Sequence, residues 1–292
     1  MATTTPTTAP TGISARGAAL LTLGSIVSVQ AGAALATTLF DEIGSAGAVL
    51  LRALFGALVL VALTRGAPLR HWPHRDVVLL GVSVATVNLL FYAALERLPL
   101  GITVTLEFVG PLGVAVFGSR RPRDLVWVLL AATGIVLLSD GGSGDIDPLG
   151  VALALGAGFC WAAYIVQSAR VGRLGPGAGG ATMAAVISAV LVAPFGIAQG
   201  GGEILDPSIL AVGAAVGVLS TAIPYVAEIE ALRRLPQAVF GVMMSLEPAV
   251  AAAIGFFALS QGLAPVEVVA IGLVVVASAG ALRSAAAPPR DS

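Results

Sequence analysis

Two glutamates lie near the middle of apolar runs that also contain proline. Glu107 lies in ITVTLEFVGPLGVAVF, and Glu247 lies in VFGVMMSLEPAVAAAIGFF. A carboxylate at the centre of a bilayer span costs about 2.5 to 3.5 kcal/mol on insertion scales, so acids at such positions commonly serve a function. The two residues therefore predict a transport pathway in which they bind a cationic group or a proton.

Arg52 is the third ionisable residue near mid-membrane. Its run, SAGAVLLRALFGALVLVAL, is otherwise apolar, so the guanidinium must face the protein interior or water. Two interpretations stay open: a structural ion pair with Glu107 or Glu247, or binding of a substrate carboxylate. In either case two acids and one base leave one carboxylate unbalanced. We expect one glutamate to be protonated part of the time or neutralised by a cationic ligand.

Prolines lie close to these acids. Pro111 follows Glu107 by four residues, and because proline has no amide hydrogen, the carbonyl of Glu107 loses its helical donor. The same loss affects two further carbonyls, that of Met244 before Pro248 and that of Ser220 before Pro224. Each break therefore offers a free carbonyl beside a polar side chain at mid-depth. The alternative is that the prolines only kink the helices for packing.

Other polar and aromatic side chains recur at helical spacing and could line the same cavity. They are Gln30 in the first apolar run, Asn88 and Tyr92 in the third, Trp161, Tyr164 and Ser168 in the sixth, and Thr221, Tyr225 and Glu228 in the eighth. For a single Tyr or Trp, the alternative is packing or anchoring at the membrane interface. The sequence predicts no catalytic residue, no metal site and no cofactor.

The composition indicates what kind of protein holds these residues. Hydrophobic residues make up 57% of the chain and charged residues 11%, which predicts a polytopic membrane protein. Apolar stretches of about 20 residues predict ten transmembrane helices. They cover residues 17–38, 45–63, 77–95, 99–117, 124–139, 149–168, 179–197, 208–227, 237–258 and 265–282. The fifth and tenth carry almost no polar side chains, so we expect them to pack away from the pathway.

The arginines predict the orientation. With both termini cytoplasmic, only Arg97 lies in an outside loop, while thirteen arginines lie in inside segments. The inside arginines are Arg16, Arg65, Arg70, Arg75, Arg120, Arg121, Arg123, Arg170, Arg173, Arg233, Arg234, Arg283 and Arg290. Residues 1–16 and 283–292 then form cytoplasmic tails, and the Thr/Pro-rich first tail is predicted to be disordered.

The chain also repeats a landmark. ALERLP at residues 94–99 and ALRRLP at residues 231–236 each precede a span with a central Leu-Glu and a nearby proline. This predicts two five-helix units, 17–139 and 149–282, and because five is odd, the second must enter the membrane from the opposite side. The expected fold is an all-α membrane protein of ten helices in two inverted five-helix repeats, with the substrate site between them. Chance similarity between apolar segments is the alternative.

Three segments carry a family resemblance: LEFVGPLGVAVFGSRRP, ALALGAGFCWAAYI and LSTAIPYVAEIEALRRLPQAVFGVMMSLEPAVAA. They resemble the threonine/homoserine exporters of the EamA group in the drug/metabolite transporter superfamily, and the likeness extends from about Gln30 to Leu282. It implies ten helices, two EamA repeats, and export of small amino acids across the bacterial cytoplasmic (inner) membrane in exchange for protons. It also implies a set of family positions at Gln30, Asn88, Tyr92, Glu107, Trp161, Tyr164, Tyr225, Glu228 and Glu247.

We therefore predict a secondary transporter with alternating access rather than an enzyme, because no HExxH constellation accompanies His71 and His74. Glu107 or Glu247 would bind the substrate ammonium, and Arg52 or a helix N-terminus its carboxylate. The alternatives are an exporter of other metabolites or cationic drugs, and a scaffold that transports nothing. Expected partners are an amino acid, protons and the lipid bilayer, with no nucleic acid; a homodimer stays open.

Overall fold

The computed structural model describes residues 14–65, 74–119, 125–140, 146–174 and 179–286, and these residues form helices and no strand. In chain order the helices are α1 (Ala15–Thr37), α2 (Phe40–Leu63), α3 (Arg75–Leu95), α4 (Leu100–Glu107), α5 (Val109–Ser119), α6 (Leu125–Asp140), α7 (Pro148–Gly172), α8 (Gly179–Gly200), the 3₁₀ helix η3 (Gly201–Leu205), α9 (Pro207–Gly217), the π-helical turn η4 (Val218–Ala222), α10 (Ile223–Leu232), α11 (Gln237–Met244), α12 (Glu247–Leu259) and α13 (Pro265–Ala286). The all-α prediction is confirmed for this part of the chain.

The predicted spans appear in the predicted order. Within the described ranges, nine segments are long and apolar enough to cross a membrane, and a tenth apolar helix, Leu125–Leu137, is shorter. The predicted tails are too long at both ends: α1 already begins at Ala15, and α13 continues to Ala286. The rest of both tails, residues 1–13 and 287–292, lies outside the described residues.

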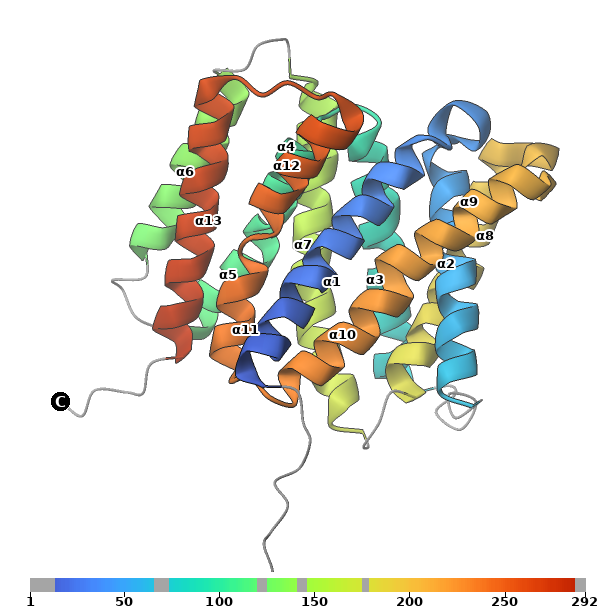
Figure 1. The fold of residues 1–292 in the computed structure, drawn as a ribbon, viewed down its shortest axis with the longest axis horizontal. Helices are drawn as coiled ribbons and strands as arrows, with labels where there is room; N and C mark the ends of the chain where they lie inside the picture. The colour runs from blue at the N-terminus through green and yellow to red at the C-terminus, as the bar shows by residue number, and fades with distance from the viewer. Residues whose placement is uncertain (1–13, 66–73, 120–124, 141–145, 175–178, 287–292) are drawn as a thin grey trace, which may run out of the picture.

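All helices run between two sides of one bundle. In Figure 1, α1 begins and α13 ends at the lower side, which we call the terminal side, and the upper side is the opposite side. Most of the arginines expected inside lie at helix ends on the terminal side; they are Arg16, Arg65, Arg75, Arg170, Arg173, Arg233, Arg234 and Arg283. Arg97 lies on the opposite side, between α3 and α4. The other inside arginines, Arg70, Arg120, Arg121, Arg123 and Arg290, lie outside the described residues.

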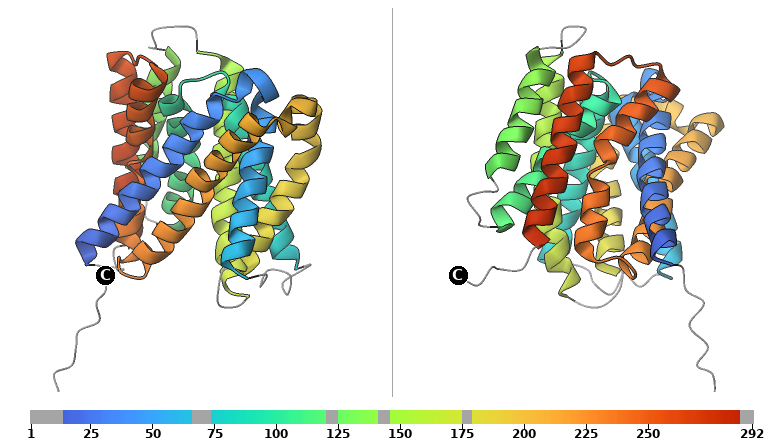
Figure 2. Two further views of the ribbon diagram at one scale, coloured as in Figure 1. Left: turned by 45° about the vertical axis from the view of Figure 1, so that its right-hand side comes forward. Right: turned by 60° about the vertical axis from the view of Figure 1, so that its left-hand side comes forward.

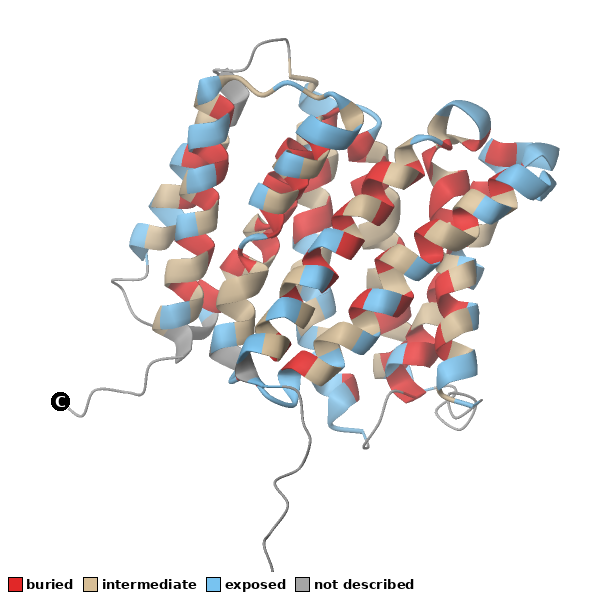
Figure 3. Cartoon of the chain, in the orientation of Figure 1, coloured by how far each residue is buried: buried red, intermediate tan, exposed pale blue. Residues whose placement is uncertain are grey.

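Burial follows the pattern of a membrane bundle (Figure 3). Large apolar side chains such as Phe117, Phe159 and Phe257 are 84%, 78% and 83% exposed, a surface that suits lipid and would be costly in water. The helix α4 is the reverse case, because all eight of its residues are buried. It packs between α7 and α12, so Glu107 at its end lies deep in the protein.

The helices α6 and α13 pack on each other at one edge of the bundle, as both views of Figure 2 show. Close packing also involves the glycines of the GxxxG at positions 213 and 217. A methyl group on Gly213 would lie 2.6 Å from Leu51, and one on Gly217 would lie 2.7 Å from Phe55. The motif therefore packs against α2 inside the bundle.

Three spans are interrupted where the sequence places proline: the fourth between α4 and α5, the eighth at η4, and the ninth between α11 and α12. The helices α4 and α11 are both eight residues long and both begin directly after a proline, Pro99 or Pro236. In Figure 1, α4 lies above α5, whereas α11 lies below α12. The two half-helices therefore run in opposite directions.

Candidate functional site

A pocket of about 590 Å³ lies in the middle of the bundle. It collects eleven of the predicted site residues: Gln30, Arg52, Asn88, Glu107, Pro111, Trp161, Tyr164, Pro224, Tyr225, Glu228 and Glu247. Ser168 and Thr221 also line it, as expected from their helical faces. As predicted, α6 contributes no lining residue among those described, and α13 contributes only Leu282.

Two predicted residues lie outside the pocket wall. Tyr92 is fully buried and packs against the rings of Phe40 and Phe91, with centroid distances of 6.0 and 5.7 Å. Its neighbour Phe91 lines the pocket, as does Asn88. Pro248 is the second residue of α12 and acts on the backbone alone.

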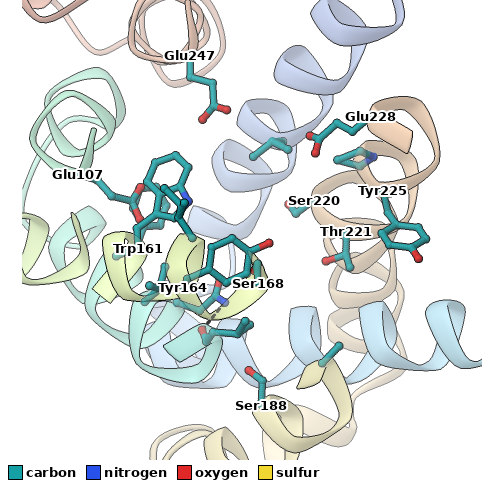
Figure 4. Close-up of a pocket in the computed structure, with 18 of the residues that line it drawn as sticks. Glu107, Trp161, Tyr164, Ser168, Ser188, Ser220, Thr221, Tyr225, Glu228 and Glu247 are labelled. Atoms are coloured by element: carbon teal, nitrogen blue, oxygen red, sulfur yellow. Dashed lines mark hydrogen bonds between the residues drawn. The ribbon is translucent and has the colours of Figure 1, made fainter. Parts of the chain in front are cut away.

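Three carboxylates point into the same space (Figure 4). Glu107 and Glu247 are only 8% and 7% exposed, and no hydrogen bond to either carboxylate is found among the described residues. Glu228 accepts a hydrogen bond of 2.7 Å from the hydroxyl of Ser25 on α1. A buried, unpartnered carboxylate is costly. Glu107 and Glu247 therefore need a proton or a nearby cation to offset the cost of burying their charge.

Arg52 lines the same pocket without an ion pair. Its guanidinium lies 5.5 Å from the ring centroid of Tyr92, and Nη1 lies 3.4 Å from the Tyr92 hydroxyl. No carboxylate of a described residue lies within 4.0 Å of it. The described residues therefore show no ion pair of Arg52 with Glu107 or Glu247, which was one of the two interpretations left open by the sequence. Tyr92 holds the guanidinium through its ring and leaves the donors of Arg52 largely free.

Two glycines allow the break after Glu107 to pack closely against α7. A methyl group on Gly158 would lie 2.5 Å from the carbonyl oxygen of Glu107, and one on Gly110 would clash with the carbonyl of Gly158. The rings of Phe108 and Trp161 meet edge to face beside this contact, at 5.3 Å and 87°. The freed carbonyl predicted from Pro111 thus lies against another backbone rather than in the pocket.

The break before Glu247 differs from the break after Glu107. Pro111 and Pro248 both lie twelve residues after the proline that precedes their half-helix. Glu107 ends α4, whereas Glu247 begins α12, three residues later in the shared frame. The two Leu-Glu pairs that suggested the repeat therefore do not occupy matching positions, whereas Pro111 and Pro248 do.

The pocket wall nevertheless contains equivalent positions from both halves of the chain. Four lining residues lie 15, 12, 11 and 8 residues before Pro99, and four more lie at the same spacings before Pro236. The first set is Val84, Val87, Asn88 and Phe91, and the second is Thr221, Pro224, Tyr225 and Glu228. The wall from the first half of the chain is thus mostly apolar, whereas the wall from the second half is polar and acidic.

The pocket extends toward the terminal side. On α2, α7 and α8, the lining residues all lie in the half of the helix nearer to that side, such as Leu60, Ser168 and Ala181. The span Pro207–Leu232 follows the same rule, with lining only from Ser220 onward.

Polar contacts join the helices on the opposite side. Gly44 has a φ of +67° and interrupts α2, which leaves the amides of Ser45 and Ala46 without helical acceptors. The Ser45 amide donates a hydrogen bond of 2.8 Å to the side chain of Glu96, and the Ala46 amide donates one of 2.7 Å to the side chain of Gln199.

Two more contacts complete this set. The side chain of Gln261 accepts a hydrogen bond of 2.9 Å from the amide of Leu100, and Arg97 forms an ion pair of 2.8 Å with Asp147. The hydrogen bond from Arg97 lowers the pKa of Asp147 from its usual value. We call Glu96, Arg97, Asp147, Gln199 and Gln261 the opposite-side clamp.

The sequence interpretation missed two hydroxyl groups of the wall, although it named Ser220 for its backbone carbonyl. The hydroxyls of Ser188 on α8 and Ser220 in η4 are buried, line the pocket, and have no hydrogen-bond partner among the described residues. Single serines in apolar helices are unremarkable because they can bond to their own backbone, so the sequence carries no sign of them.

Comparison with known proteins agrees with this architecture. Residues 148–283 match the EamA-like transporter family. The chain is 43% identical over 268 residues to proteins named threonine/homoserine exporter RhtA from Escherichia coli (strain K12) and Salmonella typhimurium (strain LT2), with 89% of this chain and 90% of each relative covered. It is 27% identical over 236 residues to the uncharacterized transporter YwfM of Bacillus subtilis (strain 168), covering 76% of this chain and 79% of that protein.

A solved crystal structure matches with a TM-score of 0.64 over 90% of this chain and 96% of that one. At 20% identity this likeness shows the fold alone. The 43% identity to the two exporters over 89% of this chain, together with the family match, establishes that this chain belongs to the EamA-like transporter family.

Proposed function

We propose that the chain exports small zwitterionic amino acids, with threonine and homoserine as the first candidates, in exchange for protons. The observation that carries the proposal is that Arg52 and Glu107, of opposite charge, line one pocket without forming an ion pair. An amino acid carries an ammonium and a carboxylate on one carbon, so it can neutralise both residues at once. The names of the 43% identical relatives support the same cargo.

The excess of carboxylates over arginine in the pocket supports proton exchange. Glu107, Glu228 and Glu247 line the pocket together with a single arginine, Arg52. Like charges confined together favour uptake of a proton. When the amino acid leaves, a proton can take the place of its ammonium group, and this couples the two movements.

Alternating access supplies the movement. We infer that the units 17–139 and 149–282 are inverted repeats that rock about the pocket. The arginines at the terminal side favour a cytoplasmic location for that side in a bacterial inner membrane, with both termini inside. The pocket then faces the cytoplasm, where an exporter loads its cargo, and the opposite-side clamp must open for release.

A second candidate is export of cationic metabolites or drugs, which the three carboxylates favour. The two candidates differ at Arg52. A cation without a carboxylate leaves the guanidinium unpaired, whereas an amino acid satisfies it.

The test is efflux from proteoliposomes across a panel of amino acids, with and without a pH gradient. We expect threonine and homoserine to leave faster than from protein-free liposomes, and a gradient that drives proton entry to accelerate this exit. Efflux of a cationic dye in place of the amino acids would support the second candidate. No gradient effect on threonine efflux would contradict proton exchange.

A further inference from the structure

The inference rests on the proposed function and concerns Tyr92, which lies outside the pocket wall but contacts a residue of that wall. The guanidinium of Arg52 lies over the Tyr92 ring, with 5.5 Å between its central carbon and the ring centroid. This distance lies within the range of a cation–π contact. The 3.4 Å from Nη1 of Arg52 to the Tyr92 hydroxyl is longer than a typical hydrogen bond. The ring, rather than the hydroxyl, is therefore the main contact between Tyr92 and this guanidinium.

The packing around Tyr92 fixes its ring. Tyr92 is fully buried, and the rings of Phe40 and Phe91 pack against it with centroid distances of 6.0 and 5.7 Å and interplanar angles of 55° and 61°. Aromatic pairs prefer tilted or edge-to-face arrangements at such distances. Because a close-packed interior has few voids, a buried ring between two others keeps one orientation. The guanidinium of Arg52 thus lies on a rigid surface.

A second contact holds α2 in register with the end of α3. Tyr92 and Glu96 lie one turn apart at the end of α3, so they face the same side of that helix. Ser45 and Arg52 lie two turns apart and share a face of α2. The carboxylate of Glu96 accepts a hydrogen bond of 2.8 Å from the amide of Ser45, while Tyr92 contacts Arg52. The two contacts together fix the position of Arg52 relative to the Tyr92 ring.

This way of holding an arginine leaves its hydrogen-bond donors available. A guanidinium has five N–H donors, arranged to bind a carboxylate through two parallel hydrogen bonds. An ion pair with a protein carboxylate would use these donors, whereas a ring attracts the cation electrostatically through its face. Arg52 lines the pocket and has no ion pair with a described residue. We propose that Tyr92 is a positioning residue, which holds the guanidinium of Arg52 for the carboxylate of the cargo without touching the cargo itself.

The experiment compares efflux of threonine and threonine amide from proteoliposomes at limiting concentration. The wild type should prefer threonine, since only the free acid can bind Arg52 through a carboxylate. Tyr92→Leu removes the ring and should lower this preference by about fivefold, through a higher KM for threonine at an unchanged maximal rate. Tyr92→Phe keeps the ring and should keep the preference within about twofold of the wild type.

Phe40→Leu is the matched control. It removes a ring that packs against Tyr92, and no contact between Phe40 and Arg52 is found among the described residues. This variant should unfold at a lower temperature than the wild type and keep the preference for threonine within about twofold. A purely structural role of Tyr92 would instead give Tyr92→Leu and Phe40→Leu the same preference.

A second variant tests the inference if Tyr92→Leu does not fold. Arg52→Lys leaves the aromatic residues in place and keeps the positive charge, but an ammonium group lacks the planar fork of a guanidinium. If the cargo carboxylate binds a guanidinium held flat on the ring, Arg52→Lys should also lower the preference by about fivefold.

A wild-type preference in folded Tyr92→Leu or Arg52→Lys protein would overturn the inference, as would an equal loss in Tyr92→Phe or Phe40→Leu. If the wild type exports threonine and its amide equally well, the inference fails and amino acid export stands. If it exports neither, the proposed function fails, and quenching of tryptophan fluorescence then measures binding of the two compounds. Weaker binding of threonine, but not of its amide, by Tyr92→Leu would uphold the positioning role. An equal change for both compounds, or no change, would reject it.

Discussion

The carbonyl oxygen of Glu107 lies so close to Gly158 that a methyl group on Gly158 would stand 2.5 Å from it. Two spans that are far apart in the chain thus meet backbone to backbone at the acid of the pocket. This contact fixes where the α4–α5 break lies relative to Trp161, and it depends on a side chain of one hydrogen atom.

Gly158→Ala should therefore destabilise the protein by about 1 to 3 kcal/mol, because overpacking forces the break away from α7. Export should fall with it, since Glu107 moves. Gly113→Ala is the control: a methyl group there meets nothing within 4 Å, and alanine favours a helix. Thermal unfolding in detergent measures both, and equal stability of the two variants would contradict the tight contact.

Glu107→Gln keeps the shape of the side chain and removes its charge. Hydrogen bonds to charged groups contribute about 1.5 to 3 kcal/mol, so threonine efflux should fall by about tenfold or more. Glu247→Gln should have an effect of similar size, whereas Glu230→Gln should not, because Glu230 pairs with Arg233 and Arg234 at the helix end. Wild-type efflux by a normally inserted Glu107→Gln protein would remove this residue from the mechanism.

The variant Arg52→Gln distinguishes a structural role of Arg52 from a role in binding the substrate carboxylate. Because no described carboxylate pairs with Arg52, the variant should insert normally and lose less than about 1 kcal/mol of stability. Its efflux should no longer distinguish threonine from threonine amide, since the partner for the carboxylate is gone. A stable variant that still prefers the free acid would assign Arg52 to another role.

The opposite-side clamp contains contacts of unequal strength. Arg97 and Asp147 are 41% and 34% exposed, and exposed ion pairs contribute about 0.2 to 1 kcal/mol, so Arg97→Ala should shift the population of the open state by less than about fivefold. Glu96→Ala strips the acceptor from the amide of Ser45, a residue that is 6% exposed, which costs about 1 to 3 kcal/mol in the closed state and should shift the population by about tenfold.

The readout for the clamp is labelling of Val104→Cys in a Cys160→Ala background, with an impermeant maleimide applied from the opposite side. Val104 lines the pocket and is 2% exposed. Faster labelling in Glu96→Ala than in Arg97→Ala is the expected order. The reverse order would show that the ion pair, not the capped break of α2, holds this side closed.

The spans could be predicted from the sequence because hydropathy and length decide them, and the acids could be found because a charge in an apolar run is conspicuous. The breaks could be located only to the nearest proline. A hydrogen-bond count shows that Pro111 removes a donor, but only packing decides that Gly158 covers the resulting carbonyl. Which of the neighbours Phe91 and Tyr92 lines the pocket also depends on packing, since the two residues differ by only about 100° around a helix.

The clamp could not be predicted for a different reason. Glu96, Gln199 and Gln261 lie near span ends, where polar residues are ordinary, and their function depends on amides contributed by other spans. The hydroxyl of Ser220 likewise lies against Gly32 on α1, a neighbour that is almost 200 residues earlier in the chain. Such partners are fixed by tertiary packing, which one sequence does not display.

The three-residue offset between Glu107 and Glu247 sets their depth in the bilayer. Eight helical residues rise about 12 Å, and the hydrocarbon layer is about 30 Å thick, so Glu107 at the end of α4 lies about 12 Å below the opposite surface. The equivalent residue Met244 at the end of α11 lies about 12 Å from the terminal surface, and therefore deeper. Moving the acid three residues onward, to Glu247, raises it by about 4.5 Å and brings it to nearly the same level as Glu107. Under the proposed function, an ammonium group would pass from one carboxylate to the other within one plane of the membrane, without a change of depth.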